Sequence, residues 1–283
     1  TMSNVNGDTW EQYMGANASL VSKDNVYGIA VYQSYRNRNP YDVNGDSFSE
    51  IGKLNMNTFG LRAYYRPTQF SRLNIEYHTT NEFRRGGNKF DLEPFESDIT
   101  EQTKHVINSG GLTYDLFWKE YKHKLSFFAS SQHVDRNSYY GAQQDPNAYG
   151  KTKDLTFVGG GMYVGNFDKV LFSPATFTAG MEYQHNNMHD IMAGYNRDLE
   201  QKVRIASAFF QNEWKMNDFT LLAGFRLDDH NLIDNLIFSP RVNMLYKPSD
   251  AFQGRLTWST GFRAPQAYDE DLHITAVGGE GVL

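Results

Sequence analysis

Residues 218–230 read DFTLLAGFRLDDH, and their side chains alternate in character along the chain. Successive side chains of a β-strand point to opposite faces, so a period of two indicates a strand with two different faces. One face collects the apolar side chains Phe219, Leu221, Ala223, Phe225 and Leu227. The other collects Thr220, Gly224, Arg226 and Asp228. The stretch therefore predicts a strand that is apolar on one side and mostly polar on the other.

The same alternation recurs along most of the chain, whereas helical periodicity is almost absent. FSRLNIEYHTT (70–80) and GGLTYDLFW (110–118) are two further examples, and LTFVGGGMYVG (155–165) is the stretch whose phase is least certain. The pattern predicts an all-β fold, an antiparallel up-and-down meander of about twelve long strands. We expect them near residues 10–20, 25–37, 53–66, 70–83, 103–118, 121–136, 153–167, 175–189, 202–216, 218–230, 238–247 and 252–263.

The links between these strands alternate between short and long, which indicates a sheet whose two ends differ. Membrane β-barrels of the outer-membrane type have tight turns at one end and long external loops at the other. A soluble β-sandwich or propeller, the alternative fold, has no reason to sort its loops by end. The short links include SKDN, RPTQF, KEYK, KMND and KPSDAF, with a moderate one at 166–174. The long links are 38–52, 84–102, 137–152, 190–201 and 229–237.

Composition agrees with a β-barrel and removes several function classes. The 283 residues include 18 Tyr, 20 Phe and 24 Gly but no Cys, which excludes a disulfide scaffold, a zinc-thiolate site and a cysteine nucleophile. The formal charge of -6 provides no general electrostatic footprint for nucleic acid. Aromatic residues gather beside lysines at the short links, as in a membrane-interface girdle. These residues are Trp118, Tyr121, Trp214, Tyr246 and Phe252.

Four short motifs follow one another along the predicted strands of the second half of the chain. They are Gly224–Arg226–Asp228, Ser239–Pro240–Arg241, Lys247–Pro248–Ser249 and GFRAP at 261–265. In this order and spacing they resemble the mid-to-late barrel of TonB-dependent outer-membrane receptors, particularly those of the Bacteroidetes. The resemblance extends over the whole chain in strand pattern and over about 206–273 in motif.

The resemblance implies that residues 1–283 are a partial β-barrel domain, an internal piece of a 22-stranded outer-membrane barrel without its plug domain and C-terminal strands. The implied function is TonB-dependent uptake of a scarce nutrient such as a ferric siderophore, cobalamin or haem. The implied partners are outer-membrane lipid, the plug, the TonB complex through the missing N-terminal part, and a small-molecule ligand. A Gram-negative outer membrane is the implied location, with neither nucleic acid, cofactor nor enzymatic activity expected.

Two other function classes stay open at this point. A porin-like or structural outer-membrane barrel would have the same wall but no energised transport. A soluble carbohydrate-active β enzyme would need a pair of carboxylates facing one cleft, and the alternation does not provide such a pair. No catalytic residue is predicted.

Arginines and tyrosines concentrate near the long-loop end, which makes them the predicted ligand-binding residues. Guanidinium and phenol groups together suit a planar or anionic ligand through charge-assisted hydrogen bonds and stacking. Packing of the loops by salt bridges is the alternative role, since acidic residues at 91–98 lie in the same segments. The predicted ligand-binding set is Arg36, Arg38, Arg84, Arg85, Arg136, Tyr139, Tyr140, Tyr195 and Arg197, with Tyr41 and Tyr149 nearby.

Two possible metal motifs do not support a predicted metal site. DVNGDSFSE (42–50) resembles a calcium loop, but an EF-hand that starts at Asp42 needs Gly at Ser47 and Glu at Lys53. A loop calcium site of another kind is left open. His185 and His189 share a face of one strand but lie roughly 13 Å apart at about 3.3 Å per residue, which is too far to share an ion. We interpret them as lumen or loop histidines.

The predicted fold determines to which face of the sheet each side chain points. A single curved sheet with nearest-neighbour pairing should place one set of apolar side chains on its convex face and a polar set on its concave face. Arg263 to Asp271 should begin an external loop. The expected convex set is Leu61, Tyr65, Leu112, Leu116, Phe225, Leu256 and Trp258.

Overall fold

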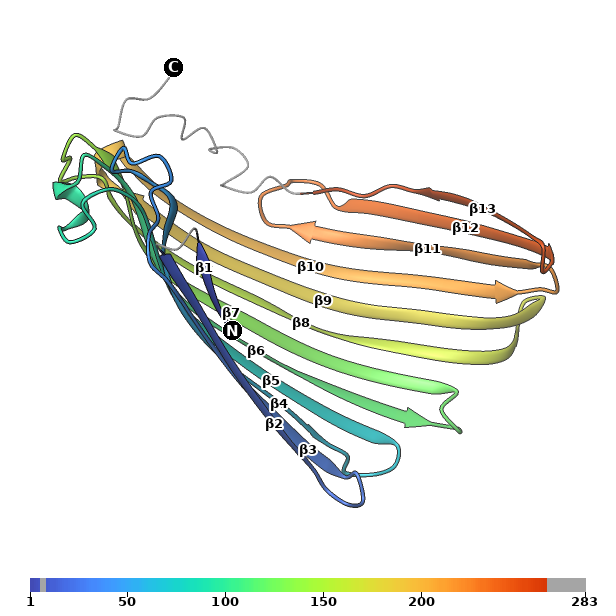
Figure 1. Cartoon of the computed structure of the whole chain (residues 1–283). Coiled ribbons are helices and arrows are strands. Elements are labelled where there is room, and N and C mark those ends of the chain that lie inside the picture. Colours follow the sequence, from blue (N-terminus) through green and yellow to red (C-terminus); the bar gives the residue numbers. More distant parts are fainter. Residues whose placement is uncertain (6–8, 264–283) are drawn as a thin grey trace.

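A computed structural model describes residues 1–5 and 9–263, and in these ranges the chain forms one antiparallel sheet (Figure 1). The sheet has 13 strands in this part of the chain, and their order in space is their order in sequence. The strands are β1 (Met2–Val5), β2 (Thr9–Val21), β3 (Tyr27–Arg38), β4 (Ser49–Tyr65), β5 (Ser71–Gly87), β6 (Ile99–Trp118), β7 (His123–Ala142), β8 (Tyr149–Val170), β9 (Ser173–Met192), β10 (Arg197–Lys215), β11 (Phe219–His230), β12 (Ile237–Ser249) and β13 (Phe252–Ser259).

The predicted all-β up-and-down meander is confirmed. Each strand pairs antiparallel with its sequence neighbours, and β2 to β13 correspond to the twelve predicted strands. The additional β1 is only 4 residues long and its sequence, MSNV, is too short for alternation to identify it. Two single-turn 3₁₀ helices, η1 (Pro94–Glu96) and η2 (Ala193–Tyr195), lie between strands. Among the described residues, no helix is long and apolar enough to cross a membrane.

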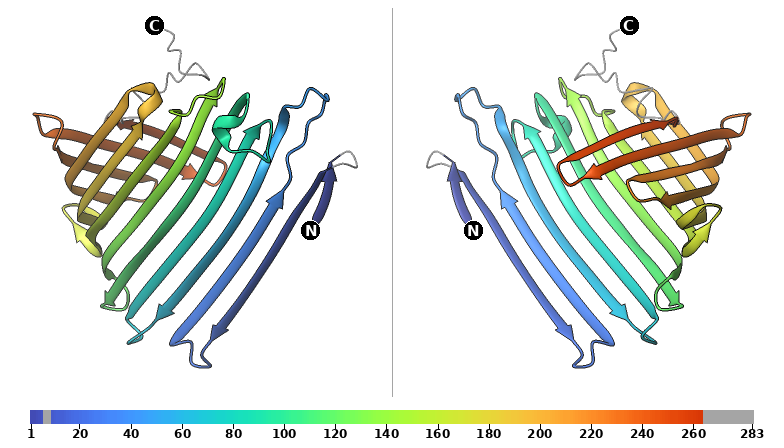
Figure 2. Two further views of the ribbon diagram at one scale, coloured as in Figure 1. Left: turned by 90° about the vertical axis from the view of Figure 1, so that its left-hand side faces the viewer. Right: turned by 90° about the vertical axis from the view of Figure 1, so that its right-hand side faces the viewer.

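The sheet is strongly curved across its width, as Figure 2 shows, so that it has a concave and a convex face. The connections are sorted by end as predicted. At one end lie the short turns 22–26, 66–70, 119–122, 171–172, 216–218 and 250–251. At the other end lie the connections 39–48, 88–98, 143–148, 193–196 and 231–236. We refer to these as the short-turn end and the long-loop end.

The predicted strand boundaries were too conservative at both ends of the sheet. Pairing continues to Ala142 in β7 and resumes at Tyr149 in β8, so most of the predicted loop 137–152 is strand. The moderate link expected at 166–174 is a tight turn between Val170 and Ser173. Apolar alternation stops before these points, but the backbone ladder does not, because polar side chains pair as strands equally well.

Directly paired residues of an antiparallel sheet share a face, so the register assigns every side chain to one side. Arg226 lies on the concave face, since it lines the hollow there together with Gln184, Ser239 and Thr257. The opposite, convex face follows from the same pairings, for example Phe210 with Phe225 and Val242 with Trp258. The seven residues expected on the convex face all lie there: Leu61, Tyr65, Leu112, Leu116, Phe225, Leu256 and Trp258.

The convex face carries a continuous apolar band next to the short-turn end. Its members are exposed, as Met181 (72%) and Leu256 (66%) illustrate, and in β9 the band runs from Ala175 to Tyr183. Such an exposed band is much larger than the apolar patches of a typical soluble monomer. A membrane strand needs about 9–11 residues to cross the bilayer core, and the band has this depth. Strand β8, with 22 residues, therefore extends well beyond the apolar region.

The uncertain stretch 155–165 has three glycines at its centre. The rings of Phe127 and Phe128 from β7 cover two of them, on opposite faces of the sheet. A Cβ at Gly161 would meet Phe127 at 3.2 Å, and one at Gly160 would meet Phe128 at 2.9 Å. The glycines of β8 have no side chains that could alternate, and aromatic rings of β7 cover the sheet at these positions instead. Aromatic rings commonly cover strand glycines in this way.

A matched pair of lysine substitutions in β9 tests the assignment of the two faces. Met181→Lys places a charge in the middle of the apolar band and should destabilise the membrane-inserted full-length barrel by about 2–4 kcal/mol. Gln184→Lys, on the concave face of the same strand, should change the stability by less than about 1 kcal/mol. Denaturant unfolding in lipid vesicles measures both. Equal losses would contradict the assignment.

Candidate functional site

The predicted arginines gather mainly on the concave face at the long-loop end. Two adjacent rows of paired residues run across the sheet there, in the direction of the backbone hydrogen bonds. The first row consists of Tyr13, Arg36, Met56, Glu82, His105, Arg136, Thr152 and Asp190. The second consists of Glu11, Arg38, Leu54, Arg84, Thr103, Ser138, Gly150, Met192 and Arg197.

Strands β2 and β3 supply the first charged group of this surface. The Arg36 guanidinium donates a short hydrogen bond from Nε to Glu11 Oε1. Arg38 lies 3.9 Å from the other Glu11 oxygen and donates from Nε to the Gly52 carbonyl at 3.1 Å. The Arg36 side chain is still 43% exposed, so one carboxylate holds two guanidinium groups without covering them. A solute that enters the concave side can reach Arg36.

Strands β5 and β6 supply the second charged group. Arg84 donates from Nε to Glu82 Oε1 at 2.8 Å and from a terminal nitrogen to Glu82 Oε2 at 3.1 Å, while its side chain stays 63% exposed. Nδ1 of His105 lies 3.7 Å from the same carboxylate. The bidentate pair fixes the direction of the guanidinium plane. Arg84 is thus held in place and open to solvent.

The third group is buried and centres on Asp190, which is 1% exposed. Its Oδ2 lies 3.1 Å from Nε of Arg197, and its Oδ1 lies 3.4 Å from a terminal nitrogen of Arg136. The Thr152 hydroxyl donates a short hydrogen bond to Asp190 and accepts one from Arg136 at 2.7 Å. One carboxylate therefore joins β7, β8, β9 and β10 at the level where η2 begins the loop 193–196.

Four of the predicted ligand-binding residues make contacts that hold the loops and strand ends together. Arg85 points to the convex side, is 6% exposed, and donates to the carbonyls of Leu92 and Lys89 and to the Ser97 hydroxyl at 2.8–3.1 Å. The Tyr139 hydroxyl donates to the Asp145 carbonyl at 2.9 Å, and its ring is fully buried.

Tyr195 donates to the Tyr140 carbonyl at 2.6 Å. This bond ties η2 to the end of β7. Arg85, Tyr139 and Tyr195 thus contact the loops through their side chains, and Tyr140 takes part through its backbone carbonyl.

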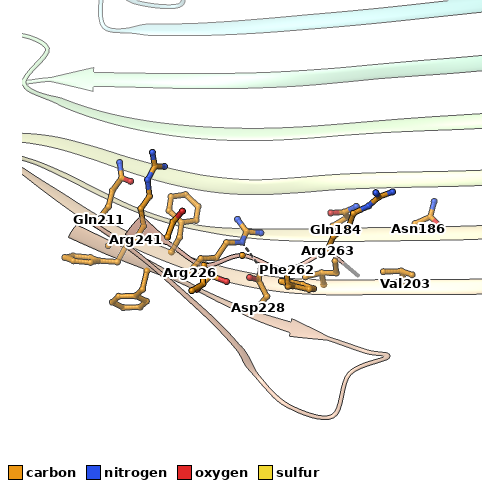
Figure 3. Close-up of a pocket in the computed structure, with 18 of the residues that line it drawn as sticks. Gln184, Asn186, Val203, Gln211, Arg226, Asp228, Arg241, Phe262 and Arg263 are labelled. Carbon is orange, nitrogen blue, oxygen red and sulfur yellow. Dashed lines mark hydrogen bonds and ion pairs between the residues drawn. The ribbon is translucent and has the colours of Figure 1, made fainter. Parts of the chain in front are cut away.

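A second concave cluster, which the sequence did not identify as a site, is centred on Arg226 and Asp228, which line the hollow drawn in Figure 3. Arg226 donates to Glu182 at 2.8 Å, to Asp228 at 2.7 Å and to the Ser207 hydroxyl at 2.7 Å. Ser207 in turn donates to Asp228 at 2.6 Å, and Asp228 is 2% exposed. The motif Gly224–Arg226–Asp228 was the available signal, but its partners Ser207 and Glu182 come from strands that only the register brings together.

The segment that resembles a calcium loop folds on itself through its acidic side chains. Backbone amides of Asn44, Gly45 and Ser47 donate to the Asp42 carboxylate at 2.7–3.2 Å. Oxygen atoms of Asp42, Asp46 and Glu50 lie within 4.8 Å of one another. The three carboxylates are near each other without the EF-hand spacing.

The two histidines of HNNMH lie within β9 on the convex face, and neither in the lumen nor in a loop, which were the two locations expected from the sequence. They pair across β9 and β10 with Arg204 and Glu200. His189 lies 2.8 Å from Asp198, so they belong to the outer surface near the long-loop end. The predicted external loop from Arg263 to Asp271 lies outside the described residues beyond 263.

Comparison with known proteins identifies the fold. Residues 12–279 match the family model described as TonB dependent receptor-like, beta-barrel. No curated protein is significantly similar in sequence. The siderophore receptor PirA from Acinetobacter baumannii is 16% identical with a TM-score of 0.74, over 93% of this chain and 42% of that one.

Two further solved structures have the same arrangement of strands. PirA from Pseudomonas aeruginosa is 15% identical with a TM-score of 0.70, over 92% of this chain and 41% of that one. The ferric enterobactin receptor PfeA of Pseudomonas aeruginosa, solved in complex with enterobactin, is 14% identical with a TM-score of 0.68, over 92% and 42%. At this identity the likeness concerns the fold, and the chain spans about two fifths of these structures (41–42%).

Substitution of Asp190 tests whether the buried carboxylate joins the strands. Asp190→Asn should destabilise the full-length barrel by about 1–3 kcal/mol, because two guanidinium groups lose their shared anion. Asp198→Asn in the same hairpin removes an exposed carboxylate and should cost less than about 0.5 kcal/mol. Denaturant unfolding measures both. A loss for Asp190→Asn no larger than that of the control would exclude the structural role.

Asp98, in the loop 88–98, gives a prediction for pH. Hydrogen bonds from Lys89 (2.6 Å) and then Asn88 (2.8 Å) hold the pKa of its carboxyl below its usual value. A depressed pKa means that the stabilisation is complete above the unfolded pKa of about 3.9 and is lost as pH falls through the folded pKa. Lys89→Gln should therefore raise the titration midpoint of Asp98, measured by carboxyl-carbon NMR, whereas Lys119→Gln at the other end should not.

Proposed function

This chain belongs to the family of TonB-dependent receptor-like β-barrels, and on that premise we propose that it supplies part of the wall and the external ligand-binding loops of an active transporter. Barrels of this family lie in the outer membrane of Gram-negative bacteria, and the family is one of receptors rather than enzymes. The proposed activity is TonB-dependent uptake of a scarce nutrient of the ferric siderophore, cobalamin or haem class.

The observation that carries this proposal is the set of guanidinium groups on the concave face at the long-loop end. Arg36 and Arg84 are anchored by carboxylates yet remain 43% and 63% exposed. In outer-membrane barrels the long loops are external, so a solute arriving from outside meets this surface first. Anchored and exposed cations favour an anionic ligand such as a ferric chelate.

The structural neighbours support an iron chelate within that range. Their names describe siderophore receptors, a ferric enterobactin receptor and a ferric citrate transporter. The residues proposed to contact the ligand are Arg36, Arg38, Arg84, Arg136 and Arg197. Arg85, Tyr139, Tyr140 and Tyr195 are proposed to act on the ligand indirectly, by holding the loops that surround it.

The proposal includes the remaining parts of the receptor. A complete wall of 22 strands, a plug domain within it and an inner-membrane TonB complex that displaces the plug would supply the transport step. The order of GFR, SPR, KPS and GFRAP supports assignment to the Bacteroidetes type of the family. The Arg226–Asp228–Glu182 cluster, deeper on the concave face, would then face the plug.

Uptake with and without energy distinguishes active transport from the porin-like alternative. Cells that express the full-length receptor should accumulate a ferric siderophore, cobalamin or haem, and deletion of the parent gene should abolish this uptake. Removal of TonB or collapse of the proton gradient should have the same effect. Uptake that persists without TonB would favour a passive barrel, and unchanged uptake of every nutrient after gene deletion would reject the transport role.

Neutralising the exposed arginines tests ligand binding separately from transport. Replacement of Arg36, Arg38 and Arg84 by Gln in the full-length receptor should weaken binding of an anionic ferric chelate at least about tenfold. The loss should be larger at low salt, because exposed charges are screened by ions. Arg255→Gln, on the concave face near the short-turn end, is the control and should bind normally. Equal affinity of the triple variant at low ionic strength would limit these arginines to loop packing.

A further inference from the structure

One histidine stands among the anchored arginines of the two concave rows at the long-loop end. His105 lies on β6, where it pairs with Glu82 of β5 on one side and with Arg136 of β7 on the other. The other charged side chains of the two rows are arginines and carboxylates, whose charge stays constant near neutral pH. An imidazole changes its charge between about pH 5 and about pH 8. His105 can therefore make the charge of this surface depend on pH.

The contacts of His105 lead to an exposed cation through one shared carboxylate. Nδ1 of His105 lies 3.7 Å from Oε1 of Glu82, and Nε of Arg84 donates to the same oxygen at 2.8 Å. The side chains of Glu82 and His105 are only 14% and 22% exposed, whereas that of Arg84 is 63% exposed. Glu82 thus lies between a covered imidazole and an exposed guanidinium, and a charge on His105 acts on Arg84 through this carboxylate.

Among the described residues, the charged groups that face His105 come from both neighbouring strands. β5 contributes Glu82 and Arg84, and β7 contributes Arg136. On β6 itself Glu101 shares the face but lies four residues away, roughly 13 Å at about 3.3 Å per residue. Burial first, and then the Arg136 guanidinium, hold the pKa of His105 below its usual value of about 6.5, against the opposing effect of Glu82. His105 is therefore neutral at neutral pH and takes up its proton in mildly acidic solution.

This proton changes the net charge of the group from zero to plus one. With neutral His105, the one guanidinium of Arg84 and the one carboxylate of Glu82 cancel. With protonated His105, two cations share the same carboxylate. The group at Glu11 differs, because Arg36 and Arg38 keep their charge throughout this range of pH.

We propose that His105 is a positioning residue that makes the concave surface bind an anionic ligand more tightly in mildly acidic solution. Protonated His105 takes a share of the Glu82 carboxylate, which leaves more of the Arg84 charge available to a solute. The inference rests on the proposed function, because it concerns arginines that are proposed to contact the ligand. By thermodynamic linkage, a ligand that prefers the protonated form must favour protonation of His105 to the same extent.

The pH profile of anion binding tests this role. The full-length receptor in a non-ionic detergent is titrated by calorimetry with hexacyanocobaltate(III), a trianion that takes up no protons between about pH 5 and about pH 8. Wild type should bind it about three- to fivefold more tightly at about pH 5 than at about pH 7.5, as expected for one added charge near an exposed site. His105→Gln retains a neutral side chain and should remove most of this step.

A matched control replaces a histidine of the adjacent strand on the other face. His133→Gln removes an exposed imidazole of β7 on the convex face and should keep the pH step. Heat-dependent mobility verifies that each variant is folded.

The titration of His105 itself gives a readout that does not depend on calorimetry. In NMR spectra of the receptor with labelled histidine side chains, the signal that His105→Gln lacks identifies His105. Its midpoint should lie below about 6.5 and should rise by about 0.5–0.7 when the trianion saturates the receptor, which is the linkage counterpart of the affinity change. In Glu82→Gln the midpoint should fall, because the carboxylate favours the protonated imidazole.

Three outcomes would overturn the inference: equal pH profiles of wild type and His105→Gln, loss of the step in His133→Gln as well, or no binding of the trianion by wild type at either pH. Energised uptake of a ferric chelate by wild type is measured in parallel. Uptake without the pH step would keep the proposed function and reject the role of His105, whereas absence of energised uptake would reject the proposed function.

Discussion

Backbone hydrogen bonding between neighbouring strands is the interaction on which the rest of this barrel wall depends. Within a bilayer an unsatisfied backbone amide or carbonyl costs several kcal/mol, and strands can satisfy these groups only through adjacent strands. The uninterrupted order β1 to β13 does this by the simplest connection, in which each strand returns beside the previous one. Because this backbone pairing does not depend on side-chain polarity, the two faces of the sheet can carry side chains of different character.

The convex and concave faces of the sheet differ in side-chain polarity. The convex face is apolar over the depth of the bilayer and carries charged and polar side chains of both signs beyond it, so its chemistry follows the layers of the membrane. The concave face is mostly polar, although Val203 and Phe209 also line its hollow, and it pairs charges within the wall, as Arg226 with Glu182 illustrates. A lumen surface with paired charges can remain hydrated and still present some cations, such as Arg84, to a solute. The same thirteen strands thus separate a lipid-facing surface from a solute-facing one.

At the long-loop end of the concave face, carboxylates hold arginine side chains in place and leave them exposed, whereas arginines that pack loops are buried. A guanidinium that is free in solution loses side-chain entropy when it binds a ligand, and a carboxylate that already fixes its direction reduces this cost. Glu11 and Glu82 serve Arg36 and Arg84 in this way while leaving them exposed. Asp190 performs a different task, since its two arginines are mostly covered and the group joins four strands. Arginines of the same rows therefore differ in what surrounds them: Arg36 and Arg84 are anchored and exposed, whereas Arg136 and Arg197 also help to join strands.

The sequence alone determined the number of long strands, their antiparallel order, the difference between the two ends and the apolar side chains of the convex face. Period-two alternation carries all of these, because a strand buried in lipid on one side must alternate. It could not determine where strands end: alternation stops at the edge of the bilayer, as at Leu155, while pairing continues to Tyr149.

Only the tertiary structure decided which charges meet and which way a residue near a strand end points. Arg84 and Arg85 are neighbours in sequence, yet the pleat sends one to the lumen and the other to the convex side beneath the loop 88–98. Arg226 meets Glu182 across two strand pairings that are far apart in sequence. Alternation shows which residues of one strand share a face. The register decides which residues of two neighbouring strands pair with each other. The register depends on turn lengths and bulges, which the alternation does not show.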